Sequence, residues 1–315
     1  MRHLPSVPFP PTKIHIYDNL MVVIGVDGEI CRIDNKTMEI LEDYSVPFPS
    51  EITNSIICNN LIVATWVANE LRQARMAALS LDSGFVNGIN KSELRFSQND
   101  RSIDCSVAGS LWSHQLDAEP VGITSEDGMI CFANYKRGIY CVDSHSDEKW
   151  RVPELSWKPI KGYSNSEMIH SIVLGPHPNF KEKNCIWVWS ISGSWITLEW
   201  SDGSIISTGN ITSKGEVDLV VSGGNDWLLG FSCGKILRCK SDGSNEEIIQ
   251  GGPCNDALKL NGIWHISGWR EDIMWSEETI QRAARKELGV ALYQHPDNGL
   301  IVLDNIGNWS AFEST

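Results

Sequence analysis

The stretch Ile139-Tyr140-Cys141-Val142-Asp143 is one copy of a phrase that returns along the chain. Each copy is a short apolar run with period two that ends in an acidic turn, which is typical of a β-strand entering a tight turn. The other copies lie at 30–34, 76–84, 196–203, 236–243 and 292–299. In four of the six copies a Gly closely follows the Asp and supplies the positive φ that hairpin turns often need. Six such units, spaced roughly 40 to 60 residues apart, predict the blades of a β-propeller.

The composition is that of an ordinary but acidic globular chain. Its 315 residues are 42% hydrophobic and 21% charged, which is enough to build one large β-domain. The 26 Lys and Arg stand against 40 Asp and Glu, so the net charge is -14. Because this charge repels phosphates and anionic lipids, we expect no nucleic acid partner and no membrane binding.

The N-terminal sequence and the cysteines predict the compartment. Residues 1–11 have no apolar core segment and are interrupted by prolines, so they predict no secretory signal. No apolar run approaches the ~18 residues that a membrane span needs. The nine cysteines form no Cys-x-x-Cys pair, and most lie in or next to predicted strands, which indicates buried free thiols in a reducing compartment. We therefore expect a cytoplasmic protein.

The repeat predicts an all-β chain that forms a single β-propeller of four-stranded antiparallel blades. Six blades fit the pattern best, and seven are the alternative. The predicted domain limits are an N-terminal extension over 1–12, the propeller over 13–304 and a C-terminal tail over 305–315 that could pair with an edge strand. A polar insertion in the second blade, 87–104, is predicted to be a surface loop.

The sixth predicted blade contains the one predicted helix. Its strands are 257–260, 263–268, 290–294 and 300–303. Between the second and third of these strands, residues 277–288 are predicted to form a short inserted helix. Ser276 is a good N-cap, Glu277 lies where the helix dipole favours anions, and Gly289 is a natural stop. Trp275 and Ile280 could pack together as a hydrophobic staple across the cap.

The third blade carries a family resemblance. Its pattern is an Asp-Gly turn and strand at 127–130, a Gly, an aromatic strand and an Asp turn at 137–143, and a Trp on the outer strand at 149–150. This pattern resembles the repeat of the PQQ-like (quinoprotein-like) propellers, and WD40-like propellers are the near alternative. The resemblance implies architecture alone. The quinone dehydrogenases of that family often carry adjacent cysteines near the cofactor, and this chain has no Cys-Cys pair.

No catalytic constellation stands out from the sequence. The histidines are scattered without metal-ligand spacing, and the repeated Asp residues occupy turn positions. Residues 230–234 match Gly-x-Ser-x-Gly, but that nucleophile motif needs a following helix, and here a strand is expected, so we predict a hairpin turn. The sequence therefore predicts no catalytic residue, no cofactor and no metal site.

A partner surface is predicted on the face built by the second-to-third-strand loops and the blade-to-blade loops. Aromatic residues beside arginine on rigid loops are typical of contact surfaces between proteins. The candidate residues are Trp66, Arg72, Tyr135, Lys136, Arg137, Trp157, Trp269 and Arg270. The connection that carries Trp157 also holds Lys158, Lys161 and Tyr163. Trp187, Trp189, Trp195 and Trp200 crowd two neighbouring strands and are predicted to pack between blades, with a stacking platform for a ring or sugar as the alternative.

These observations predict a non-catalytic cytoplasmic scaffold that presents loops on one face to a protein partner. The long inserts in the second and sixth blades favour this reading. The alternative is an enzyme or a small-ligand-binding protein that uses the funnel at the propeller axis. That alternative would require polar side chains from several blades to converge, and it rests on fold analogy.

Overall fold

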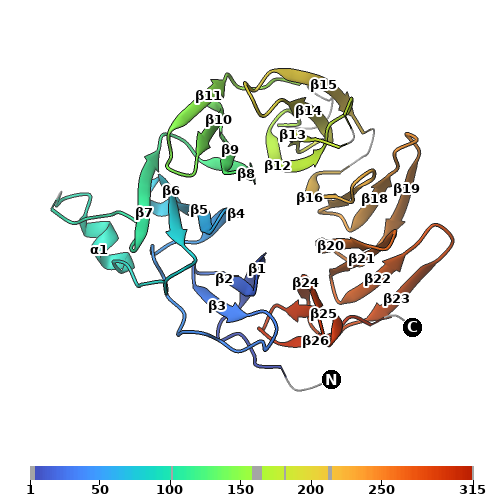
Figure 1. Cartoon of the computed structure of the whole chain (residues 1–315), viewed down its shortest axis with the longest axis horizontal. Helices are drawn as coiled ribbons and strands as arrows, with labels where there is room; N and C mark the ends of the chain where they lie inside the picture. The colour runs from blue at the N-terminus through green and yellow to red at the C-terminus, as the bar shows by residue number, and fades with distance from the viewer. Residues whose placement is uncertain (1–3, 101, 158–164, 181, 212–214, 314–315) are drawn as a thin grey trace. The chain divides into compact units, whose positions relative to one another are not determined.

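The computed structural model describes residues 4–100, 102–157, 165–180, 182–211 and 215–313. The described residues form 26 strands that pair into seven antiparallel sheets, and each sheet is built from strands consecutive in the chain (Figure 1). The chain divides into two compact units. We call residues 7–154 the N-terminal unit, and residues 155–315 together with 1–6 the C-terminal unit.

The N-terminal unit holds three sheets. The first contains β1 (Pro11–Tyr17), β2 (Leu20–Gly25) and β3 (Ile30–Asp34). The second contains β4 (Ile52–Cys58), β5 (Leu61–Ala68), β6 (Gln73–Ser80) and β7 (Ser110–Leu116). The third contains β8 (Pro120–Glu126), β9 (Met129–Asn134), β10 (Gly138–Asp143) and β11 (Glu148–Val152). A 3₁₀ turn, η1 (Asn69–Leu71), joins β5 to β6, and a short helix, α1 (Lys91–Phe96), lies between β6 and β7.

The C-terminal unit holds four sheets. The fourth sheet contains β12 (Ile169–Pro176), β13 (Asn184–Ser190), β14 (Ser194–Leu198) and β15 (Ile205–Asn210). The fifth contains β16 (Val217–Ser222), β17 (Trp227–Phe231), β18 (Lys235–Cys239) and β19 (Asn245–Ile249). The sixth contains β20 (Cys254–Leu260), β21 (Ile263–Gly268), β22 (Glu271–Trp275) and β23 (Ile280–Ala284). The seventh contains β24 (Gly289–His295), β25 (Gly299–Asp304) and β26 (Trp309–Ala311).

The prediction of six blades is wrong, because the connection between the predicted strands 263–268 and 290–294 forms two strands instead of a helix. β22 precedes the predicted helix 277–288 and β23 lies within it. Together they complete the sixth sheet, so the strands from Gly289 onward form a seventh. Ser276 does cap backbone N–H groups, but those of Glu278 and Thr279 in the hairpin turn between β22 and β23. The one α-helix among the described residues is α1, in the insertion that the sequence had predicted to be a loop.

The first and last sheets have three strands rather than the predicted four. Where a fourth strand would complete the first blade, residues 40 and 45 make isolated bridges instead of a ladder. Ile33 pairs with Ile40, and Ile30 pairs with Ser45. The other five sheets are four-stranded, as predicted.

The first strand of every sheet begins with a β-bulge. In all seven sheets the pairing register shifts between the first and the third residue of that strand. A bulge re-aims a side chain and increases the local twist. Beside two of the bulges an asparagine bonds the start of the next sheet. Nδ2 of Asn54 donates to the carbonyl of Pro120 at 3.2 Å, and Nδ2 of Asn255 donates to that of Gly289 at 2.7 Å.

The core of each unit lies between successive sheets. In the N-terminal unit all eight residues of β5 are buried, with apolar clusters on both faces of the second sheet. In the C-terminal unit the tryptophans pack as predicted: the rings of Trp187 on β13 and Trp227 on β17 lie 4.7 Å apart between their centroids. Face-to-face sheets need bulky interdigitating side chains of this kind.

Two further observations bear on the environment of the chain. All nine cysteines are free, and six of them are buried. Among the described residues, every helix is too short or too polar to cross a membrane.

The β2–β3 turn offers a stability test, because Gly28 has φ +87° and a Cβ placed there would lie 2.2 Å from the Ser50 carbonyl oxygen. We expect Gly28→Ala to lower the free energy of unfolding by about 3 kcal/mol, through backbone strain and displacement of Ser50. Gly243→Ala is the matched control. It has φ +84° with nothing within 4 Å, so strain alone should cost about 1 kcal/mol. Equal losses in denaturant unfolding would contradict the close contact at Gly28.

Candidate functional site

The candidate site surrounds the connection between β5 and β6 in the N-terminal unit. We call residues 67–74 the β5–β6 rim. The backbone turns sharply here: η1 is closed by Arg72, whose φ is 51° and whose N–H donates to the Asn69 carbonyl at 3.2 Å. Val67 and Ala68 are still buried, whereas Asn69, Glu70 and Arg72 are exposed. The rim therefore presents polar side chains on a short, rigid support.

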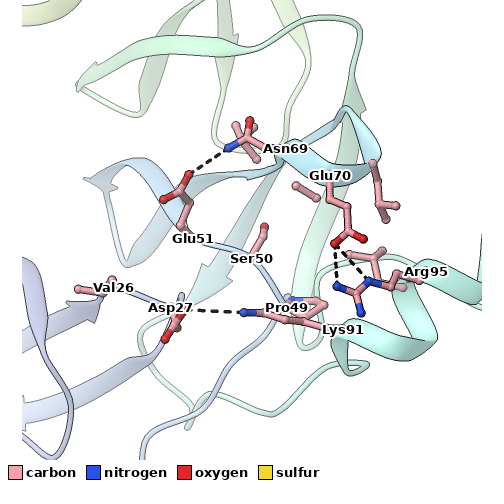
Figure 2. A pocket seen from close by; sticks show the side chains of 13 residues that line it. Val26, Asp27, Pro49, Ser50, Glu51, Asn69, Glu70, Lys91 and Arg95 are labelled. Carbon is pink, nitrogen blue, oxygen red and sulfur yellow. Dashed lines mark hydrogen bonds and ion pairs between the residues drawn. The ribbon is translucent and has the colours of Figure 1, made fainter.

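One pocket of about 360 Å³ opens beside the rim (Figure 2). We call it the α1 pocket. Four elements enclose it: the β2–β3 turn, the connection from the first to the second sheet, the β5–β6 rim and α1. It is lined by Val26, Asp27, Pro49, Ser50, Glu51, Val67, Ala68, Asn69, Glu70, Leu71, Lys91, Leu94 and Arg95.

Helix α1 closes one side of this pocket. A capping box holds its start, in which Oδ1 of Asn90 accepts from the N–H of Glu93 at 3.0 Å and Oε2 of Glu93 accepts from the N–H of Asn90 at 2.8 Å. Leu94 is 3% exposed and packs into the core of the N-terminal unit. The spacing Asn-x-x-Glu is the sequence signal that could have identified this helix. It is inconspicuous, because only six residues follow it as helix.

Two exposed ion pairs tie α1 to the other walls, as Figure 2 shows. Nζ of Lys91 lies 3.7 Å from Oδ1 of Asp27, and Nη2 of Arg95 lies 2.8 Å from Oε2 of Glu70. The hydrogen bond from Arg95 lowers the pKa of Glu70, so this carboxylate is ionised at neutral pH. Glu51 has a weaker partner: its Oε1 accepts from Nδ2 of Asn69 at 3.4 Å.

A second pocket of about 220 Å³ lies on the other side of the rim. We call it the β7–β8 pocket. It shares Val67 and Asn69 with the α1 pocket, and its far wall is the connection Leu116–Glu119. Asp117 in this wall lies 3.4 Å from Nε of Arg137. The rim thus stands between two hollows, with acidic residues on both sides.

The structure brings together some of the predicted contact residues and excludes one. Arg72 lines the β7–β8 pocket, and Arg137 pairs with its wall. Lys136 is exposed on the same turn as Arg137, with Nζ 5.0 Å from the centre of the half-buried Tyr135 ring. Trp66 is fully buried, so the prediction that it contacts a partner is wrong. The reason is that β5 continues to Ala68, which keeps Trp66 inside the sheet.

In the C-terminal unit, Trp269 and Arg270 are exposed on the β21–β22 turn, with Trp269 45% exposed. The Trp269 ring lies against Gly252, where an added Cβ would come within 2.5 Å of its Cγ. The backbone N–H of Trp269 donates to the Pro253 carbonyl at 3.2 Å, which fixes the backbone that carries the ring. Trp157 is half-buried. Lys158, Lys161 and Tyr163 lie outside the described residues.

Two features of the described residues bear on metal binding and catalysis. Among the described residues, no group of three or more His, Cys, Asp or Glu side chains is arranged to hold a metal ion. The Gly-x-Ser-x-Gly string is a hairpin turn, as predicted: β17 ends at Phe231, the N–H of Gly234 donates to its carbonyl at 2.8 Å, and β18 follows directly.

The anchoring of α1 can be tested by hydrogen exchange. A six-residue helix is unstable alone, so Leu94→Ala should release α1 at a local cost of about 2–3 kcal/mol. We expect the amides of Leu94 and Ser97, which bond to Asn90 and Glu93, to lose most of their protection. Arg95→Ala is the control, because an exposed ion pair contributes little. Equal loss of protection in Arg95→Ala would show that the ion pairs hold the helix.

Comparison with known proteins identifies the architecture. No protein-family model matches the sequence, and a search of the curated proteins gave no match. Among solved structures, the β-propeller domain of Cps50 (Swd1) from Myceliophteria thermophila aligns at a TM-score of 0.67 and 12% identity, over 98% of each chain. The WD40 β-propeller domain of Doa1 aligns at 0.63 and 10% identity, over 98% of this chain and 93% of that one.

A computationally designed protein, Ika8, aligns at a TM-score of 0.61 and 12% identity, over 98% of this chain and 97% of that one. The Doa1 domain is a WD40 propeller, which is the alternative that the sequence left open beside the PQQ-like repeat. At 10–12% identity the likeness extends to the fold alone. The chain is a seven-bladed β-propeller.

Proposed function

We propose that this propeller is a non-catalytic scaffold that binds a protein partner through the β5–β6 rim. The observation that carries the proposal is the pair of pockets on either side of the rim, one of them walled by an inserted helix. Protein contact sites are commonly built from loops that a rigid sheet holds in place, with arginine beside small pockets. The cytoplasmic location expected from the sequence belongs to the same proposal, and the nine free thiols support it.

The axial alternative is less well supported. In a propeller the first strand of each blade borders the axis, and a ligand site there needs polar side chains with free hydrogen-bonding capacity. Several polar side chains of these strands instead bond to neighbouring strands. Nζ of Lys13 donates to the Ser55 carbonyl at 3.1 Å, and Asn54 and Asn255 bond to the starts of the next sheets. This use of polar groups favours a structural role for the first strands.

Affinity capture with rim variants tests the proposal. Tagged wild-type protein should retain a stoichiometric protein partner from its native lysate, and the purified partner should bind directly. Asn69→Trp should fill both pockets, and Arg72→Ala should remove an exposed contact, so each is expected to weaken binding at least about 10-fold at an unchanged melting temperature. Arg151→Ala, an exposed arginine on β11, is the matched control and should bind normally.

Two results would count against the proposed site. Full binding by both rim variants would show that the partner does not contact the rim. Loss of binding in Trp269→Ala alone would place the contact in the C-terminal unit instead. A wild-type protein that retains no partner would contradict the scaffold itself.

A further inference from the structure

We propose that the α1 pocket receives a basic side chain, lysine or arginine, from the partner. The proposal rests on the scaffold function above and specifies the chemistry of the partner at one position. Four observations lead to it: the shape of the pocket, its charge, the charge of the surrounding unit, and a hydroxyl without a partner.

The pocket is lined by both buried apolar residues and exposed acidic residues. Val67, Ala68 and Leu94 contribute buried apolar side chains to the lining. Asp27, Glu51 and Glu70 are exposed acidic residues of the same lining (Figure 2). Lysine and arginine bury an apolar stem while the charged head stays among polar groups. A volume of about 360 Å³ accommodates one such side chain with room for its backbone at the mouth. The two kinds of surface thus match the two halves of a basic side chain.

Among the described residues, one carboxylate of the pocket has no cation as its partner. Asp27 pairs with Lys91 and Glu70 pairs with Arg95, whereas the partner of Glu51 is the Asn69 amide. An entering cation would therefore meet a net negative site. The Asp27–Lys91 and Glu70–Arg95 pairs are exposed and screened by water. Each carboxylate can therefore contact a second cation at a small cost in free energy.

The wider field has the same sign. Residues 7–154 contain 21 Asp and Glu against 12 Lys and Arg. A negative field over the whole unit attracts a basic segment during diffusional encounter and repels an acidic one. An acidic ligand would also have to displace Asp27 from Lys91 or Glu70 from Arg95 before it gained a cation. Both considerations favour a basic occupant.

Ser50 adds a specific acceptor to the wall. Its hydroxyl is buried and makes no hydrogen bond within the described part of the chain. A buried polar group without a partner costs free energy, which an N–H donor from a ligand would recover. Because Ser50 lines the pocket, its hydroxyl is a candidate acceptor for an ammonium or guanidinium group there.

Methyl NMR with defined probes tests this inference without the natural partner. The reporters are the methyl groups of Val26, Val67, Leu71 and Leu94, all of which line the pocket. The probes are acetylated, amidated alanine pentapeptides with a central lysine, arginine, citrulline or glutamate. We expect the lysine and arginine peptides to shift these methyl signals and to bind at least about 5-fold tighter than the citrulline and glutamate peptides, with affinity falling as salt is added.

Charge-neutralising variants identify the groups responsible. Glu51→Gln and Glu70→Gln should each weaken binding of the arginine peptide about 5-fold. Glu39→Gln makes the same change on an exposed residue beyond the end of β3, away from the β2–β3 turn, and should leave binding unaltered. Tighter binding of the glutamate peptide, or equal effects of all three variants, would overturn the inference.

The two proposals can fail separately. If none of the peptides shifts the methyl signals of the pocket while Asn69→Trp still abolishes capture of the partner, the proposal of a basic side chain is wrong and the scaffold proposal stands. The opposite outcome is also possible. If the arginine peptide binds in a way that depends on Glu51 while the rim variants still bind the protein partner fully, the proposed scaffold site is wrong and the cation-binding pocket stands.

Discussion

The fold depends on the fact that a four-stranded sheet with two apolar faces cannot be stable alone and must be covered on both sides. The second sheet shows this most clearly. On one face Ile62, Ala64 and Trp66 of β5 pack into one cluster, and on the other face Leu61 and Val63 pack into another. Each sheet therefore completes its core only against its neighbours in the chain, which is why the sequence repeats. The loops are free of this demand, so the pockets and the inserted helix lie there.

Strand periodicity and turn chemistry predict most of this architecture, and the failures have specific causes. Trp275 and Ile280, expected to staple the start of a helix, are instead directly paired across β22 and β23. Ser276 caps a turn with the same hydrogen bonds that would start a helix. A short segment with a capping serine and glutamates carries no local signal that separates these outcomes. The surrounding sheet decides between them, because it supplies β21 as a pairing partner.

The candidate site is less predictable than the fold. Arg72 and Arg137 were predicted from their place in loops between strands. Arg72 lies on the rim, and Arg137 pairs with the wall of the β7–β8 pocket. Trp66 was misplaced because it lies within β5, on the face that packs into the apolar cluster of the N-terminal unit, and not in the loop beyond the strand. The α1 pocket joins segments from Val26 to Arg95, and nothing in their local sequence signals that they meet. A pocket enclosed by segments far apart in the sequence forms only when the whole unit packs, so the local sequence does not predict it.

The bulge at the start of every first strand has a consequence for how such a chain can change over evolutionary time. The connections that precede these strands differ greatly in length, from the three residues between β7 and β8 to the 17 residues between β3 and β4. The extra residue of the bulge, at the start of each first strand, separates the path of the preceding connection from the regular strand pairing that follows. Insertions and deletions in a connection are therefore absorbed at the bulge, before they can shift the alternation of buried and exposed side chains. Surface loops can be exchanged while the core keeps its register.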